Sequence, residues 1–252
     1  RKIADLYRSY MDTDRIEALD AQPLQPYLAA IRNIGSYDAM AVYMGGTQGR
    51  FGSSFFGIGI GDDAKDPDRY VTYAGQSGLG LPSRDYYLDE RYAEKKVLYQ
   101  AYVERMLTMI GWDNPAETAA QIVDLESQIA EVHWTPEQNR NRDETYNPFT
   151  PTELAAHAPG FDWAGYLNAA GLGGIERLVV RQDTALPKIA QIFADAPMPV
   201  LQAWQAFHTA DDMAPYLSKR FSDAQWEFRG RDLSGQPEQR ARDKRAVSFS
   251  EG

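Results

Sequence analysis

The sequence predicts a mainly α-helical fold that carries one small antiparallel β-hairpin. Over much of the chain, apolar residues recur at three- and four-residue spacing, which places them on one face of a helix. Between Phe55 and Tyr73 this spacing gives way to short runs of glycine and β-forming residues. Apolar residues make up 43% of the 252 residues, which is enough to bury a substantial core.

Three short helices are predicted before the hairpin. Asp12-Thr13-Asp14 is typical of a helix start, and Gly35 is typical of a helix end. The hairpin combines the apolar run 55–60 with the β-forming run 70–73 across an acidic loop. We therefore expect helices over residues 1–12, with Ile3, Leu6, Tyr7 and Tyr10 on one face, then over residues 13–19 and 23–34.

After the Pro- and Gly-containing loop 78–82, the pattern predicts helices throughout. Pro115 suits the first turn of one of them. Pro215 predicts a kink or a break in the long helix that follows Pro199. The expected helices cover residues 98–110, 115–132, 149–157, 161–170, 186–195 and 199–221, and a final charged helix begins near Pro237.

Composition limits the partners of this chain. Its net charge of −10 repels phosphate backbones, so we expect no nucleic-acid partner. No stretch approaches the roughly 20 apolar residues that span a bilayer, so we expect no membrane segment. The absence of Cys excludes disulfides and thiolate chemistry. The chain opens at Arg1 without a signal sequence and stops in mid-pattern at Gly252, and we expect both ends to have been cut from a longer protein.

The three histidines do not form a recognisable metal motif. A zincin site needs two His residues four positions apart on one helix, so that both ring nitrogens reach one ion. None of His133, His157 and His208 has such a neighbour. We therefore assign no catalytic residue and no metal ligand, and we expect each His to be a structural or surface residue.

Two further motifs are better explained by the hairpin than by a ligand. Gly59–Ala64 matches the G-x-G-x-x-A dinucleotide pattern, but Pro67 and a second strand follow where a helix would have to begin. The acidic loop 62–68 lacks the glycine and the glutamate that a calcium loop needs. The 36 Asp and Glu residues leave a carboxylate-based hydrolase open, although the sequence selects no pair.

Residues 78–88, Gly-Leu-Gly-Leu-Pro-Ser-Arg-Asp-Tyr-Tyr-Leu, resemble a segment typical of the N-terminal region of the neprilysin and endothelin-converting-enzyme family. Leu6–Met11 is similar to the family's "LYRSC" opening, and Leu125–Ala130 is similar to its "ELExxIA" helix. These segments occur in the family order, and the match covers essentially the whole chain. Tyr10 stands where animal members usually have Cys, which favours a disulfide-free bacterial member.

This resemblance implies that residues 1–252 form the non-catalytic N-terminal lid of a zinc metallopeptidase that cleaves short peptides. Members of the family have two mostly helical lobes around an enclosed chamber, and their zinc is held by a HExxH lobe expected beyond Gly252. This segment alone is predicted to be inactive and to hold no cofactor. We expect segments 1–30 and 236–252 to pack against the missing C-terminal catalytic lobe, and the enzyme to be periplasmic or secreted.

Loop 78–88 supplies the substrate-binding candidates Arg84, Asp85, Tyr86 and Tyr87. In one interpretation the two tyrosines fix a buried turn, while Arg84 and Asp85 form hydrogen bonds with the backbone or with each other. In the other, Arg84 or Tyr87 faces the chamber and contacts the peptide. The alternative function for the whole chain is a stand-alone helical interaction module without peptidase activity.

Overall fold

The computed structural model describes residues 2–250, and the side chains of residues 4–248. Arg1, Glu251, Gly252 and the side chain of Ile3 therefore lie outside the described part. The fold is mainly α, as predicted. Its helices are α1 (Lys2–Met11), α2 (Thr13–Leu19), α3 (Gln25–Arg32), α4 (Tyr37–Gly46), α5 (Asp85–Leu88), α6 (Ala93–Met109), α7 (Pro115–Val132), α8 (Pro136–Asn139), α9 (Pro151–His157), α10 (Trp163–Ala169), α11 (Leu186–Asp195), α12 (Met198–Met213), α13 (Lys219–Gln225) and α14 (Arg242–Ser250), with a π-helix over Trp226–Leu233.

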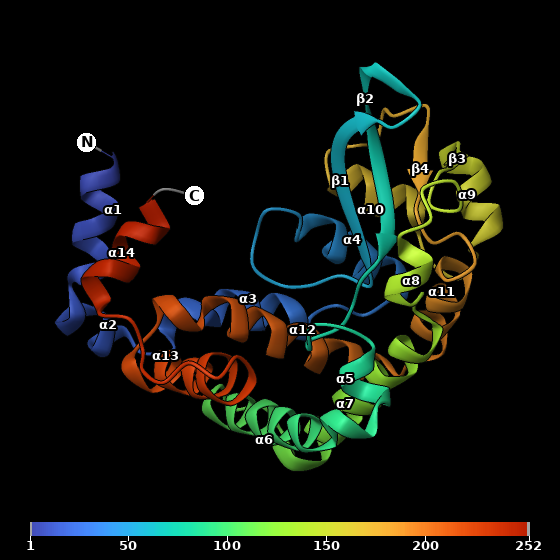
Figure 1. Ribbon diagram of the computed structural model, residues 1–252. Coiled ribbons are helices and arrows are strands. Elements are labelled where there is room, and N and C mark those ends of the chain that lie inside the picture. Colours follow the sequence, from blue (N-terminus) through green and yellow to red (C-terminus); the bar gives the residue numbers. More distant parts are fainter. Residues whose placement is uncertain (1, 251–252) are drawn as a thin grey trace.

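The elements form a U in Figure 1. The sheet, with α8 to α11 around it, rises on one side, and α1 and α14 rise together on the other. The helices α3, α6, α7, α12 and α13 form the base between the two arms. Both termini lie at the arm made by α1 and α14, so the first and the last helix of the chain are neighbours (Figure 1).

The base is built around α12, which is buried on nearly every face. Leu201, Trp204 and Phe207 have no solvent exposure, and α3, α6 and α7 all pack against this helix. A helix that is apolar on all sides is typical of the centre of a core. Even so, no helix in the described part of the chain is long and apolar enough to cross a bilayer.

Local sequence signals explain where several helices begin and end. The Asp12 carboxylate accepts a hydrogen bond from the Arg15 backbone N–H, which caps α2 as expected. Pro115 begins α7. The break predicted at Pro215 is confirmed, because α12 ends at Met213 and a 3₁₀ turn containing this proline separates it from α13.

The predicted hairpin is present, but it belongs to a larger sheet. Its strands are β1 (Phe56–Asp63) and β2 (Asp66–Gln76), with Gly59 opposite Tyr73. The strand order is β1-β2-β4-β3, in which β4 (Leu178–Val180) runs parallel to β2 and β3 (Asn147–Phe149) runs antiparallel to β4. The prediction of helices throughout the second part of the chain is therefore wrong at β3 and β4. A three-residue strand is too short to show a period, and distant pairing stabilises it.

Helix α4 is not predicted by the sequence pattern, because Gly45-Gly46 suggests a turn. The Ser36 hydroxyl caps its first turn by accepting from the Ala39 N–H. Gly45 instead permits close packing: a Cβ there would lie 2.2 Å from the Tyr166 carbonyl oxygen on α10. The final helix also differs from expectation, since α14 begins at Arg242 rather than near Pro237 and follows the π-helix.

We predict that Gly45→Ala separates α4 from α10 and destabilises the protein by about 1–3 kcal/mol, the usual cost of an overpacked core. Gly46→Ala is the matched control, because a Cβ at this neighbouring position would meet nothing within 4 Å. Thermal unfolding of the two variants measures the difference. Equal melting temperatures would show that the contact between the two helices is not tight.

Candidate functional site

Tyr87 fixes the loop that carries the family resemblance. Its ring is buried, and its hydroxyl donates to the Glu126 Oε2 at 2.6 Å. The same hydroxyl accepts from the backbone N–H groups of Gly80 and Leu81, at 3.0 and 2.9 Å. Burial and the nearby charge of Glu126 raise the pKa of Tyr87 well above its ordinary value, so the hydroxyl keeps its proton. One side chain thereby links the beginning of the loop to α7.

The other three candidates lie on the same loop, and Arg84 also contacts α7. The Arg84 Nε donates to the Ala130 carbonyl oxygen at 3.2 Å, near the end of α7. The ring of Tyr86 stacks on Tyr92 with 4.2 Å between centroids. Asp85 is half-buried at the first position of α5. These contacts anchor the loop, and contact between any of the four residues and a peptide stays a prediction.

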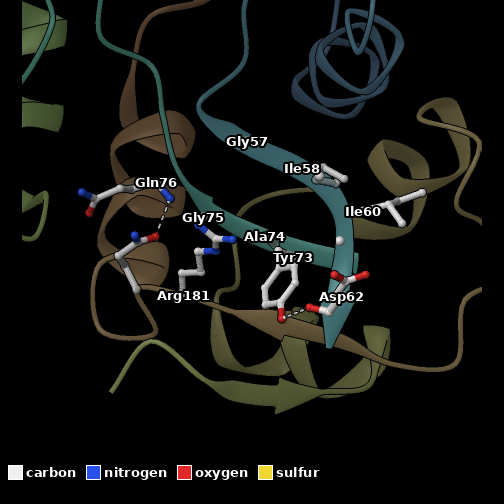
Figure 2. A pocket seen from close by; sticks show the side chains of 12 residues that line it. Gly57, Ile58, Ile60, Asp62, Tyr73, Ala74, Gly75, Gln76 and Arg181 are labelled. Atoms are coloured by element: carbon white, nitrogen blue, oxygen red, sulfur yellow. Dashed lines mark hydrogen bonds between the residues drawn. The ribbon is translucent and has the colours of Figure 1, made fainter. Parts of the chain in front are cut away.

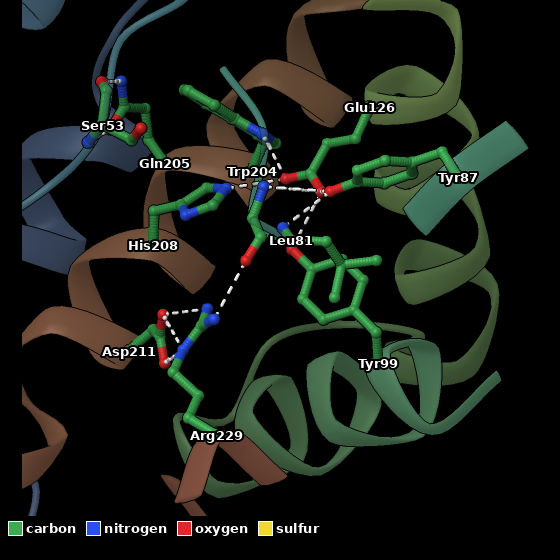
Figure 3. A network of polar contacts seen from close by, with 11 residues as sticks. Ser53, Leu81, Tyr87, Tyr99, Glu126, Trp204, Gln205, His208, Asp211 and Arg229 are labelled. Carbon is green, nitrogen blue, oxygen red and sulfur yellow. Dashed lines mark hydrogen bonds and ion pairs between the residues drawn. The ribbon is translucent and has the colours of Figure 1, made fainter. Parts of the chain in front are cut away.

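Glu126, on α7, is the centre of a polar network inside the base (Figure 3). Its side chain has no solvent exposure. The Trp204 indole donates to Oε1 at 2.9 Å, and the His208 Nε2 lies 2.8 Å from the same oxygen. The Tyr99 hydroxyl donates to Oε2 at 2.9 Å, beside the Tyr87 hydroxyl and the backbone N–H of residue 80. A buried carboxylate is tolerated only when such donors replace its water, and here five donors do so.

A second buried pair extends the network toward the C-terminal part of the chain. The Arg229 guanidinium, on the π-helix, contacts the Asp211 carboxylate at 2.5 Å, and the Tyr102 hydroxyl donates to the same carboxylate at 2.6 Å. Burial by itself lowers the pKa of Arg229, but the charge of Asp211 outweighs this and raises it. The Arg229 Nη1 also donates to the Gly80 carbonyl at 2.9 Å. Gly80 is therefore held through both its N–H and its carbonyl.

Gly80 has no room for a side chain. A Cβ there would lie 1.8 Å from the Tyr99 hydroxyl oxygen and 3.1 Å from the Glu126 Oε2. This close approach explains why the loop carries glycine at its point of attachment.

The network borders a polar cavity of about 390 Å³ between loop 52–53, α12 and the π-helix. The Asp212 carboxylate accepts from the Gly52 N–H at 3.0 Å, and burial raises the pKa of Asp212 above its usual value. The oxygens of Glu126 and Asp211 are occupied by donors from the chain itself, which favours a supporting role over bond chemistry. The described residues contain no group of three or more His, Cys, Asp or Glu side chains that could hold a metal ion.

The three histidines lie in separate places. The His133 Nε2 donates to the Ser77 carbonyl oxygen at 3.0 Å, and the His157 Nε2 donates to the Asp183 carbonyl oxygen at 2.7 Å. His208 contacts Glu126, as described above. Burial lowers the pKa of His133 to about 4, although its hydrogen bond acts in the opposite direction.

Sequence reasoning missed Glu126 and Arg229 as members of this network. One signal was available for Glu126, since it lies between Ile122 and Ile129 at the spacing of one helix face. A carboxylate on an apolar stripe indicates a buried charge with partners. No comparable local signal marks Arg229, because its partners lie on loop 78–88, α6 and α12.

We predict that Glu126→Gln destabilises the protein by about 3 kcal/mol. The NH₂ group of the glutamine amide is a donor, and it would face the donors that now surround the carboxylate. The melting temperature should fall by about 6–12 °C. Tyr99→Phe is the control: it removes one donor of the five and should cost about 1 kcal/mol. A Glu126→Gln protein as stable as the parent would contradict the prediction.

We also predict that His133 makes stability depend on pH. The unfolded chain protonates this residue near pH 6.5, whereas the native chain does so only near pH 4. Stability is therefore lost as the pH falls from about 6.5 to 4, by up to about 1 kcal/mol for each pH unit. His133→Gln removes this titration. The unfolding free energy of the parent minus that of the variant should therefore become smaller as the pH falls from about 6.5 to 4. A constant difference would contradict the prediction.

Comparisons with known proteins agree on one family. The model of peptidase family M13 matches residues 1–252. Endothelin-converting enzyme 1 of Bos taurus is 28% identical over 248 residues, which cover 90% of this chain and 32% of the relative. The solved zinc metalloprotease Zmp1 of Mycobacterium tuberculosis, in complex with an inhibitor, is 33% identical with a TM-score of 0.93, and the match covers 98% of this chain and 38% of that one.

A more distant structure shows the fold alone. PepO from Lactobacillus rhamnosis HN001 has a TM-score of 0.80 at 17% identity, over 99% of this chain and 40% of its own. The chain spans about a third of the length of the curated relatives that it matches. Because the family model covers the whole chain, this protein belongs to peptidase family M13, as its resemblance to neprilysin and endothelin-converting enzyme predicted, and it corresponds to the N-terminal part of that family.

Proposed function

We propose that this chain is the N-terminal lid of a zinc metallopeptidase that cleaves short peptides inside an enclosed chamber. The likeness to Zmp1, a zinc metalloprotease solved with an inhibitor, carries this proposal, since it extends over 98% of the chain at a TM-score of 0.93. The U-shaped arrangement in Figure 1 is also consistent with one wall of a chamber. An enclosed site admits peptides, rejects folded proteins and excludes water from the reaction.

The described residues do not fit a zinc site. Each of the three histidines contacts a different acceptor, and no group of metal-ligating side chains accompanies any of them in the described part. We therefore propose that zinc and the catalytic residues belong to a HExxH lobe supplied by other polypeptide, and we derive no catalytic step from this chain. Its contribution would be to shape the chamber and to bind peptide.

We propose that the arm formed by α1 and α14 docks on that catalytic lobe. The Arg242 guanidinium donates to the Tyr10 carbonyl oxygen at 2.7 Å and lies 4.2 Å from the centre of the Tyr10 ring, which joins the two helices. Leu6 and Val247 remain 46% and 47% exposed on this arm. Such apolar side chains near both ends of the chain are suited to burial against a second lobe. This would place segments 1–30 and 236–252 beside the lobe interface.

We propose a structural role for Arg84, Asp85, Tyr86 and Tyr87, which would hold loop 78–88 against α7 and keep the base rigid. A periplasmic or secreted location for the enzyme follows from the family resemblance. Peptides would then be its substrates outside the cytoplasm.

The test uses the full-length protein that contains this chain. We predict hydrolysis of short peptides, loss of hydrolysis when a chelator removes the metal, and recovery on addition of zinc. Folded proteins should be cleaved far more slowly than peptides of the same sequence. Hydrolysis that continues in the chelator would instead favour a carboxylate-based hydrolase, and a metal-free protein without hydrolysis would favour an interaction module.

A further inference from the structure

The strand β1 leaves one of its edges open. It is the outer strand of the order β1-β2-β4-β3, and its second edge pairs with no strand among residues 2–250. Every second residue of such a strand directs its N–H and carbonyl groups outward, where another strand can pair with them. In Figure 1 this edge is on the side of the sheet that faces α1 and α14 across the U. The edge therefore faces the concave side of the lid.

The middle of β1 lacks the residues that usually prevent an edge strand from pairing with another strand. Natural edges are protected by proline, by lysine or by inward-pointing charges. Residues 56–61 have the sequence Phe-Gly-Ile-Gly-Ile-Gly and contain none of these. Lys65 and Pro67 lie only at the hairpin turn and just beyond it. Side chains already contact the outward backbone groups of Phe56 and the carbonyl of Asp62, so the strand is open to pairing at Ile58 and Ile60 between them.

Glycines on β1 give the strand one flat face. Gly57, Gly59 and Gly61 alternate, so they share a face of the sheet. A Cβ at Gly59 would meet nothing within 4 Å, and one at Gly57 would meet only the Ser77 Cβ, at 3.9 Å. Glycine weakens a strand, and it commonly marks a place where a ligand or another backbone approaches closely. No neighbour within the described chain explains Gly59.

A cavity of about 500 Å³ lies beside this strand (Figure 2). In Figure 2, Ile58 and Ile60 point away from Tyr73 and Arg181, which lie together on the other side of the hairpin. The Tyr73 hydroxyl donates to the Asp62 carbonyl oxygen at 2.8 Å, which holds its ring across β1. Ile60 is 68% exposed on the opposite face. On the glycine face the Tyr73 ring lies over Gly61 and leaves the position of Gly59 open, and on the other face Ile60 is exposed.

Arg181 supplies a fixed positive charge in this cavity. Its guanidinium lies 4.7 Å from the centre of the Tyr73 ring, and it forms no ion pair with a carboxylate in the part of the chain that is described. Arg181 is exposed and has no carboxylate partner among the described residues, so it is complementary to a carboxylate brought by a ligand. Its stacking on the ring limits the conformations of the guanidinium and so favours a single position for that carboxylate.

We propose that β1 binds substrate peptides in an extended conformation, as an added strand, with a peptide carboxylate paired to Arg181. Backbone hydrogen bonds supply affinity in this mode without requiring a particular sequence. The open space at Gly59 leaves room beside the edge for a side chain of the added strand. The binding mode rests on the proposed peptidase function and adds a peptide-holding surface on the lid, separate from the metal-bearing lobe.

The first experiment compares Gly59→Val with Gly35→Ala in the full-length protein, with a chelator present to prevent hydrolysis. Valine favours strand structure, so a loss of binding by Gly59→Val does not come from unfolding. Gly35 lies outside the sheet, and a Cβ added there would likewise meet nothing within 4 Å, which makes it the matched control. The probe is a fluorescein-labelled peptide of about ten alternating Val and Thr residues. We expect about tenfold weaker binding to Gly59→Val and less than about twofold change for Gly35→Ala.

The second experiment identifies the backbone and carboxylate contacts. N-methylation of one alternating set of peptide amides should weaken binding about tenfold, whereas methylation of the other set should be tolerated. Three versions of the peptide carry an internal Glu, a free C-terminal carboxylate, or neither. Arg181→Gln should remove the advantage of whichever carboxylate is bound and leave the neutral peptide unchanged.

Hydrogen exchange of the full-length protein decides whether the edge is free. The amides of Ile58 and Ile60, which point away from β2, should exchange readily without peptide and become protected when peptide binds. Protection without peptide would show that another part of the protein covers the edge, and it would overturn the proposal. Equal affinity of Gly59→Val and the parent for the probe peptide would also overturn the proposal. If the parent binds the probe but never hydrolyses peptides, the peptidase function fails while strand addition stands. If the protein hydrolyses peptides in a zinc-dependent way and Gly59→Val binds the probe as well as the parent does, strand addition fails while the peptidase function stands.

Discussion

A single carboxylate without solvent contact sets the geometry of the base. Glu126 is held by donors from α6, α12, α5 and loop 78–88, so its placement depends on all of these elements together. A buried charge is costly when even one important partner is lost, because water cannot replace that partner. The donors in this network are directional, so they fix the orientation of the groups that meet at Glu126. The loop is therefore fixed relative to the helices by polar contacts as well as by the buried side chains of Leu81 and Tyr87.

Gly80 connects the two buried charges. Its N–H donates to the Glu126 Oε2 and its carbonyl accepts from Arg229, which is itself paired with Asp211. Movement of the loop would disturb both pairs at once, and each would lose a hydrogen bond in a medium of low dielectric constant. The π-helix that carries Arg229 leads through residues 234–241 to α14. The loop, the base and the C-terminal end of the chain are thus connected through one set of contacts, which suits a lid that has to keep its shape.

The parts of this fold that the sequence predicted are those whose signals are local. The long helices α6, α7 and α11 have periodic apolar stripes, and the hairpin has contiguous β-forming runs. Helix α4 was missed because the reason for Gly45 is its contact with Tyr166, far along the chain. The strands β3 and β4 were missed because pairing with distant residues creates them. The loop was found through its family resemblance, but the partners of Glu126 come from several elements, and no single window of sequence contains them.

The base and the sheet edge differ in how far the chain itself supplies partners for their polar groups. In the base, every carboxylate oxygen of Glu126 and Asp211 accepts hydrogen bonds from the chain itself. This arrangement constrains which residues the sequence can carry there. At the sheet, β1 has an edge without a strand partner and Arg181 has no carboxylate partner within the described residues. An exposed strand edge with glycine positions is unfavourable for an isolated domain, because it weakens the strand and invites aggregation. The proposed addition of an extended peptide accounts for this open edge beside a tightly satisfied interior, because a peptide has the matching donors and acceptors.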